Sequence, residues 1–243
     1  MNDLRFALRQ LLKNPGFTAV AVLTLALGIG ATTAVFSIVD AVLLKPLPYD
    51  EPGQLVQVWE APGLGQRNWA SPGAFRDWKE HGTVFEELSL LDSREVNFTG
   101  GGEPERVSGL AMSASGLSIL RVRPVLGRIF AADDDQAGKD QVVVLGHGFW
   151  QRRFGGDASV VGRTIQLNDQ SRTVIGVLAP TALPWGPTDF VGPTAILPGA
   201  ANERGSHWLQ AFGRLKPGET VEHAGAEMSA VAARLRPRSE DVV

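Results

Sequence analysis

The hydrophobic and polar positions divide the chain into one long uncharged run near its start and a series of short segments after it. Residues 17–39 form 23 consecutive positions without a charged side chain. Eleven of these are Leu, Ile, Val or Phe, each of which favours insertion by roughly 0.3–0.6 kcal/mol near the bilayer centre. A helix rising about 1.5 Å per residue would cross a hydrocarbon layer of roughly 30 Å. The run therefore predicts a transmembrane helix over residues 17–44.

The charges on either side of this run predict its orientation. Arg5, Arg9 and Lys13 precede it, whereas acidic residues dominate the stretch that follows. Positively charged flanks of a transmembrane helix stay inside the cell. We therefore expect the helix to span the cell (inner) membrane with the N-terminus in the cytoplasm. The domain of residues 45–243 would then be periplasmic or extracytoplasmic. Residues 1–16 place leucines on one helical face and the three bases on another, which predicts an amphipathic basic helix lying on membrane lipid.

Other interpretations of the run fit less well. A cleaved signal peptide has an apolar core of about 7–15 residues, shorter than this one, and a soluble core helix is rarely so uniform. Gly28, Gly30 and Thr33 are spaced almost like the dinucleotide-binding G-x-G-x-x-G motif, but threonine replaces the third glycine and no βαβ pattern follows.

Small residues recur along one face of the expected transmembrane helix. Ala26, Gly30 and Ala34 lie four positions apart, a spacing that lets another transmembrane helix approach closely. Alanine and glycine are also common in such helices without a packing role, and the sequence does not decide between the two interpretations.

After the run, short strand-like and helix-like segments alternate irregularly, which predicts an α+β domain and not a Rossmann sheet. Ser71 and Pro72 have the order of a helix N-cap and first-turn proline, so a short helix is expected over 73–81. Asn168 and Asp169 tolerate hairpin-turn conformations. The expected strands are 55–59, 85–91, 95–98, 106–112, 142–145, 164–167, 172–178 and 208–215. The other expected helices are 113–120, 147–154 and one from near Thr220.

Two further stretches complete this pattern. In the last helix, one face at helical spacing carries Val221, Ala224, Met228, Val231 and Leu235. Residues 179–202 are rich in proline and glycine and are expected to be the least regular part of the domain.

Composition and motifs exclude several classes of function. A formal net charge of -3 argues against nucleic-acid binding, and the lack of cysteine removes disulfides and thiolate chemistry. There is no phosphate-binding G-x-x-x-x-G-K-[ST] loop and no G-x-S-x-G elbow. We therefore expect neither a catalytic residue nor a cofactor, and no hydrolysis of ATP by this chain through the usual loop.

Metal sites are not expected either. The four histidines, at positions 81, 147, 207 and 223, are far apart in the sequence. Asp133, Asp134 and Asp135 begin like a calcium loop, but Ala137 stands where an oxygen ligand is needed and Val144 where the closing glutamate belongs. A solvated acidic turn is the better interpretation.

The amino-acid sequences of several segments resemble those of a known family. The stretch from Leu4 to Tyr49, LRFALRQLLKNPGFTAVAVLTLALGIGATTAVFSIVDAVLLKPLPY, is similar to the opening of FtsX-like/MacB-like ABC permeases, especially their duplicated acidobacterial-type orphan branch. The similarity continues in the same order through SPGAFRDWKE (71–80), VLGRIFAADDD (125–135), VVVLGHGFWQRRFGGDASVVGRTIQLN (142–168) and GRLKPGET (213–220).

The resemblance implies a MacB-like periplasmic core domain inserted after the first transmembrane helix. In such proteins a separate cytoplasmic ABC ATPase binds ATP, and the permease passes its motion to the outer domain for export or efflux. The implied partners are this ATPase, the other permease helices in a dimer, and membrane lipid. Arg5, Arg9 and Lys13 are candidate contacts to lipid or to the ATPase. Three further transmembrane helices are expected in the family, so the chain is interpreted as the N-terminal part of a permease, as a truncated gene product, a fragment or one segment of a split permease.

Two alternatives remain beside the permease. A membrane-tethered extracytoplasmic binding or sensor domain would have no ATPase partner. An exported enzyme would need a nucleophile, a base and an orienting group, and none can be named in this sequence.

Overall fold

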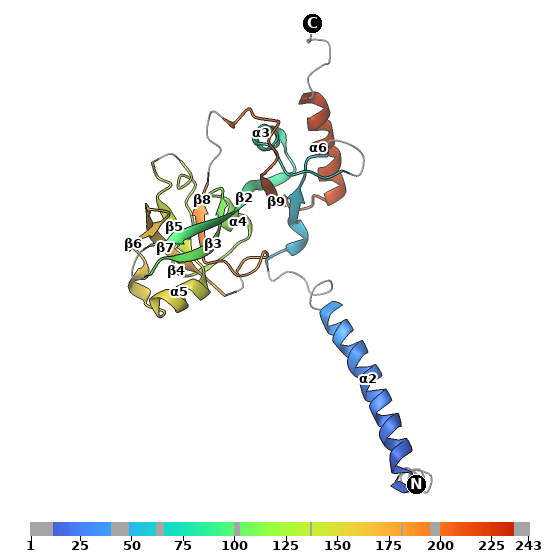
Figure 1. Ribbon diagram of the computed structural model, residues 1–243. Coiled ribbons are helices and arrows are strands. Elements are labelled where there is room, and N and C mark those ends of the chain that lie inside the picture. Colours follow the sequence, from blue (N-terminus) through green and yellow to red (C-terminus); the bar gives the residue numbers. More distant parts are fainter. Residues whose placement is uncertain are drawn as a thin grey trace. The chain divides into compact units, whose positions relative to one another are not determined.

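The computed structural model describes residues 12–39, 49–61, 66–99, 103–136, 138–180, 182–194 and 200–235. The chain forms two compact units, residues 1–48 and residues 49–243. The first unit contains α2 (Pro15–Val39). The second, called the outer domain from here on, contains the other elements (Figure 1). Its helices are α3 (Pro72–His81), α4 (Gly116–Ile119), α5 (His147–Phe154), α6 (Val221–Leu235) and the 3₁₀ turns η2 (Pro52–Gln54) and η3 (Ala158–Val160).

The nine strands found among the described residues join in one sheet. They are β1 (Leu55–Val58), β2 (Phe85–Phe98), β3 (Glu105–Met112), β4 (Pro124–Gly127), β5 (Val142–Leu145), β6 (Thr164–Leu167), β7 (Gln170–Leu178), β8 (Phe190–Pro193) and β9 (Gln210–Leu215). Their order is β1-β9-β2-β3-β8-β5-β7-β4, and β6 pairs with both β2 and β7. The α+β fold class expected from the sequence is confirmed.

Part of this sheet closes on itself. Each of β2, β3, β8, β5, β7 and β6 pairs with the next, and β6 returns to β2 through the single pair Phe98 and Leu167. A hydrophobic cluster inside this ring, the ring core, receives a buried side chain from every one of the six strands. From α5, Phe149 and Trp150 complete it. Ring closure protects strand edges that would otherwise remain open to other chains.

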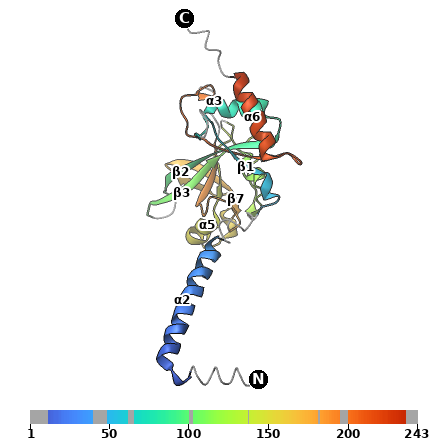
Figure 2. The same ribbon diagram turned by 90° about the vertical axis from the view of Figure 1, so that its right-hand side faces the viewer.

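A second part of the sheet is open and is covered by helices. Here β1, β9 and the first half of β2 lie side by side, and α3 and α6 pack over one face. Figure 1 and Figure 2 both show α3 and α6 together at one end of the outer domain, with α5 at the other end. The opposite face of the sheet contributes to a central core that includes Met112 and Phe212.

β2 belongs to both parts of the sheet. Its residues up to Leu91 pair with β9, and its residues from Leu91 to Phe98 pair with β3. The sequence predicted two separate strands, 85–91 and 95–98, because polar residues interrupt the apolar pattern. That prediction was wrong, since the exposed polar residues between them continue the backbone pairing with β3.

Local sequence signals correctly predicted several elements. The Ser71 hydroxyl accepts a hydrogen bond from the Ala74 N–H at the start of α3, as expected of an N-cap. Asn168 and Asp169 both have positive φ, 49° and 60°, and connect β6 to β7 as a tight hairpin. Gly155 closes α5 in the left-handed conformation that favours glycine.

Other elements differ from the expectation. β4 and β8 were not predicted, and β8 lies within the stretch expected to be least regular. Each is four residues long and contains proline and glycine, so only pairing with neighbouring strands identifies it. In α6, Ala224 and Val231 are buried as expected, but Val221 is 57% exposed because it stands at the first turn. The helix expected at 113–120 is shorter, α4.

Candidate functional site

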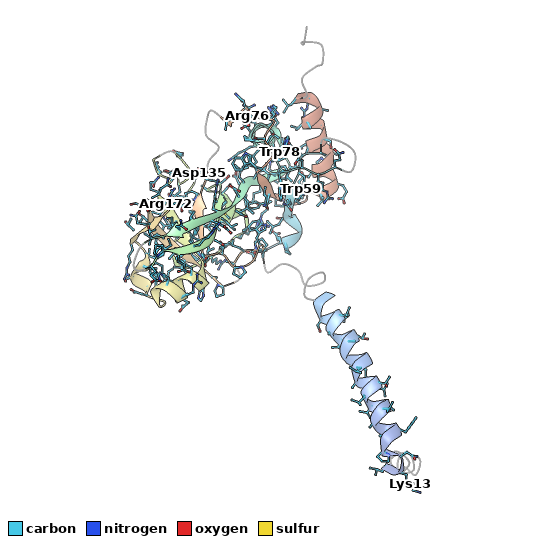
Figure 3. The ribbon with its side chains drawn as sticks, in the orientation of Figure 1. Lys13, Trp59, Arg76, Trp78, Asp135 and Arg172 are labelled. Carbon is cyan, nitrogen blue, oxygen red and sulfur yellow. The ribbon has the colours of Figure 1, made fainter. Side chains whose placement is uncertain are left out.

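α2 is long and apolar enough to cross a membrane, and among the described residues it is the one helix that is; its candidate span is Pro15–Ser37. In Figure 3 its side chains project outward on all sides along its length. Leu23 and Ile29 are 61% and 66% exposed. By its length and composition α2 is therefore a candidate membrane span. The predicted span 17–44 includes residues 40–44, which lie outside the described residues.

Three threonine hydroxyl groups of α2 are satisfied within the helix. Thr18, Thr24 and Thr32 each donate a hydrogen bond of 2.8–3.0 Å to the carbonyl four residues earlier. An unsatisfied hydroxyl would be costly in hydrocarbon. These threonines therefore do not weaken the prediction of a spanning helix.

The predicted packing face of α2 and the basic cluster that precedes this helix can be located only in part. Ala26, Gly30 and Ala34 are exposed residues of the helix, and a Cβ added at Gly30 would meet no atom within 4 Å. Lys13 is exposed and lies two positions before the start of α2 (Figure 3). Arg5 and Arg9 lie outside the described residues. The packing role and the ATPase or lipid contact stay predictions.

The carboxylates of the acidic turn 133–135 all bind groups of the protein itself. Asp134 is buried, and its carboxylate accepts hydrogen bonds from Arg128 at 2.6 Å and from the Ala131 N–H at 2.7 Å. Burial alone would raise its pKa, but these hydrogen bonds lower it below the usual value. Asp133 pairs with Lys139, and Asp135 accepts the Ala114 N–H at 2.9 Å. These carboxylates stabilise a turn.

The histidines are dispersed and have local partners. His207 lies 2.6 Å from Glu60, His223 contacts Glu219, and His147 packs edge-on against Trp150. Within the described part of the chain, no group of three or more His, Asp or Glu residues could hold a metal ion.

The arginines form structural networks. Arg152 on α5 donates to Glu105 at 2.9 Å and to Asp189 at 3.1 Å, so it ties the helix to β3 and to the start of β8. Arg172, labelled in Figure 3, lies 3.9 Å from Asp140 and contacts its backbone carbonyl. Arg214 was not predicted as a buried residue, but it is only 1% exposed. The available signal was a single charged residue within the mostly apolar segment 208–215.

Several tryptophans form part of the surface, as well as the core. Trp78 and Trp150 are buried, whereas Trp185 and Trp208 are 40% and 45% exposed. Trp59, labelled in Figure 3, stacks on Trp69 with ring centroids 4.8 Å apart.

A cleft of about 430 Å³ lies between the C-terminal part of α3, the start of β2 and α4. Its lining combines both charge signs with small residues, including Lys79, Glu87, Ser115, Asp135 and Arg214. Lys79 lies 3.6 Å from Glu87, so these two charges already pair with each other. The cleft offers no arrangement of nucleophile, base and orienting group.

Comparison with known proteins identifies a family for this chain. The family model described as MacB-like periplasmic core domain matches residues 18–231. A sequence search among curated proteins returned no match. The family match includes most of α2 together with the outer domain.

Solved structures resemble the fold at low sequence identity. The periplasmic region of MacB from Actinobacillus actinomycetemcomitans matches with TM-score 0.59 and 14% identity, over 75% of this chain and 84% of that one. A domain of a permease protein from Porphyromonas gingivalis gives TM-score 0.55 and 17% identity over 74% and 78%. The extracellular domain of the noncanonic ABC-type transporter YknZ from Gram-positive bacteria gives 0.56 and 13% over 74% and 94%.

Proposed function

Because the chain belongs to the MacB-like periplasmic core domain family, we propose that it is the membrane-anchored N-terminal part of an ABC-transporter permease. In this proposal α2 crosses the cell (inner) membrane with its N-terminus in the cytoplasm, and the outer domain is periplasmic or extracytoplasmic. A separate ATPase binds and hydrolyses ATP, and this chain transmits the resulting motion outward for export or efflux. The observation that carries the proposal is one family match that includes both α2 and the outer domain.

The sheet topology supports a mechanical role. β1 is the first strand after residues 49–54, it pairs with β9, and α6 follows β9 in the chain. The segments that enter and leave the outer domain therefore both attach to its open three-stranded part. β2 continues without interruption from this part into the ring. Displacement of β1 or β9 would reach the ring through a hydrogen-bonded strand and would not have to cross a loop.

Membrane association is the first test of the proposal. Full-length protein should remain in the membrane pellet after alkaline carbonate washing, because an apolar span is not released by breaking ionic contacts. A reporter fused at the C-terminus should be inaccessible from the cytoplasm. Release into the supernatant, or a cytoplasmic C-terminus, would contradict the proposed topology.

The second test concerns the ATPase. Mild detergent extraction followed by affinity purification of this chain should recover an ATP-binding subunit. Stable membrane insertion without any ATP-binding partner would instead favour a tethered binding or sensor domain. Charge reversal at Arg9 should reduce recovery of the ATPase, whereas alanine at Asn14 serves as a control that removes no charge. Full recovery with reversed Arg9 would refute the contact assigned to the basic cluster.

The third test concerns partner helices. Gly30→Leu should weaken association of α2 with other transmembrane helices, because a bulky side chain prevents close backbone approach. The matched control is Ile29→Leu, which introduces leucine at the adjacent position without adding bulk, because isoleucine and leucine have the same number of atoms. Unchanged association in Gly30→Leu would remove the packing face of Ala26, Gly30 and Ala34 from the proposal.

A further inference from the structure

Arg214 joins three parts of the outer domain that are far apart in sequence. Its Nε donates to the Ile119 carbonyl at 2.9 Å. Its Nη1 donates to the carbonyls of Asp50 at 3.0 Å and Glu51 at 3.3 Å, and lies 3.4 Å from the Gln54 side-chain oxygen. One side chain on β9 thus contacts both the end of α4 and the segment that enters the domain.

The backbone of Arg214 holds the same segment. Leu55 is its partner in the antiparallel pairing of β1 with β9. The main chain of Arg214 therefore fixes the residue where β1 begins, while its side chain extends back to residues 50, 51 and 54. The guanidinium is buried, and its Nη2 has no partner among the described residues. Burying a charged guanidinium is costly unless it is hydrogen-bonded. The hydrogen bonds from Arg214 to three backbone carbonyls offset this cost.

A second contact fixes the outer side of this segment. Glu51 and Arg121 have positive φ values of 48° and 52°, a region that residues other than glycine adopt only when their surroundings hold them there. Their side chains form an ion pair of 2.9 Å. Tyr49 packs against the central core, and its hydroxyl donates to the Ala182 carbonyl at 3.2 Å.

We propose that Arg214 and the Glu51–Arg121 ion pair form a clamp that makes residues 49–54 move as one body with β9 and α4. This inference rests on the proposed function and adds a mechanical detail to it. Motion of α2 can reach the sheet of the outer domain only if residues 49–54, which lie between the two in the chain, are held stiffly. Without the clamp, displacement of residue 49 would extend the segment before it moved the sheet. The clamp itself is a property of this chain and is testable without an ATPase.

The absence of cysteine from the chain allows a direct distance measurement. Gly53→Cys and Gly225→Cys place spin labels on the clamped segment and on α6. Gly148→Cys with Gly225→Cys forms a reference pair between α5 and α6. A Cβ at any of these glycines meets no atom within 4 Å. Pulsed electron spin resonance on the full chain in lipid nanodiscs then reports the 53–225 and 148–225 distance distributions.

The proposal predicts a narrow 53–225 distribution in the parent protein and a broad one in Arg214→Met, with the 148–225 distribution unchanged. A 53–225 distribution as narrow as in the parent would overturn the clamp. If both distributions broaden, Arg214→Met has loosened the whole fold, and Arg121→Glu decides the question. This exposed substitution sets like charges against Glu51 and Glu86, so it should broaden the 53–225 distribution alone.

Exchanging the charges of residues 51 and 121 distinguishes a specific clamp from a general structural role of these residues. Combined with Glu86→Gln, which removes the carboxylate 3.9 Å from Arg121, the exchange Glu51→Arg with Arg121→Glu restores the ion pair and should recover the narrow 53–225 distribution. If Arg121→Glu leaves that distribution narrow, or if the exchange fails to recover it, the ion pair is not part of a clamp. Failure to recover an ATP-binding partner would count against the proposed function and would leave these distances unaffected.

Discussion

The junction between β5 and α5 allows a sharp test of the fold with two neighbouring glycines. Gly146 is the N-cap of α5, and its N–H donates to the Asp189 carbonyl at 2.8 Å. It is buried where the start of α5 meets the start of β8. Gly148, two residues later, is exposed on the first turn of the same helix. We consider alanine at each position.

The magnitude follows from the space at each glycine. A Cβ on Gly146 would lie 1.7 Å from the Thr188 carbonyl oxygen, whereas real Cβ contacts stay above 3.0 Å, so the backbones must separate by about 1.3 Å. Overpacking costs about 1–3 kcal/mol, and loss of the hydrogen bond to Asp189 adds about 1 kcal/mol. We expect Gly146→Ala to lower the free energy of unfolding by roughly 2–4 kcal/mol.

Gly148→Ala should have the opposite sign. A Cβ there meets no atom within 4 Å, and alanine is favoured over glycine inside a helix by about 0.5–1 kcal/mol.

Tryptophan fluorescence during thermal unfolding of the full chain in detergent micelles measures both effects. For a domain of this size each kcal/mol shifts the midpoint by about 2–4 °C, so Gly146→Ala should melt roughly 4–16 °C below the parent protein. Gly148→Ala should melt at or slightly above the parent. Equal midpoints for Gly146→Ala and the parent would refute the close approach of β5, α5 and β8, and so would equal losses in both variants.

Three further outcomes are expected. Phe149→Ala should lower the free energy of unfolding by about 3–5 kcal/mol, because this ring is 1% exposed and packs edge-on against Phe98 at 5.4 Å; urea denaturation checks it, and a loss under about 1 kcal/mol would contradict the ring core. Glu227→Gln should lower stability at pH 7 by about 1 kcal/mol. Burial opposes it, but hydrogen bonds from residues 83 and 84 lower the pKa of Glu227 below 4.5, so its contribution is present above about pH 4.5 and lost as pH falls through the folded pKa. Melting curves of parent and variant should therefore converge in acid, and a constant difference would refute this. Asp134→Asn should destabilise the 128–135 turn, seen as faster amide exchange at Ala131, since the lowered pKa of Asp134 keeps it charged for Arg128; unchanged exchange would contradict that role.

Interactions between residues close in sequence determined the features that were predicted correctly. The N-cap of α3, the positive-φ turn at Asn168 and Asp169, and the glycine end of α5 all depend on residues within a few positions. The apolar run behind α2 likewise needs no partner, because its length alone matches a bilayer. Resemblance in ordered segments gave the family for the same reason, since it depends on residues read in chain order.

Only the tertiary structure decided which strands meet and where the buried arginine lies. The strands β4 and β8 contain too few apolar residues to be recognised alone, and β2 crosses a polar stretch because β3 supplies its partners. No local pattern indicated that Arg214 is buried, and its contacts with Ile119 and Asp50 join positions 95 and 164 residues away. The sequence thus determined the long apolar helix α2, the local turns and the family, because these depend on near neighbours. The ring, the continuous β2 and the clamp were decided by contacts between distant residues, which no local pattern contains.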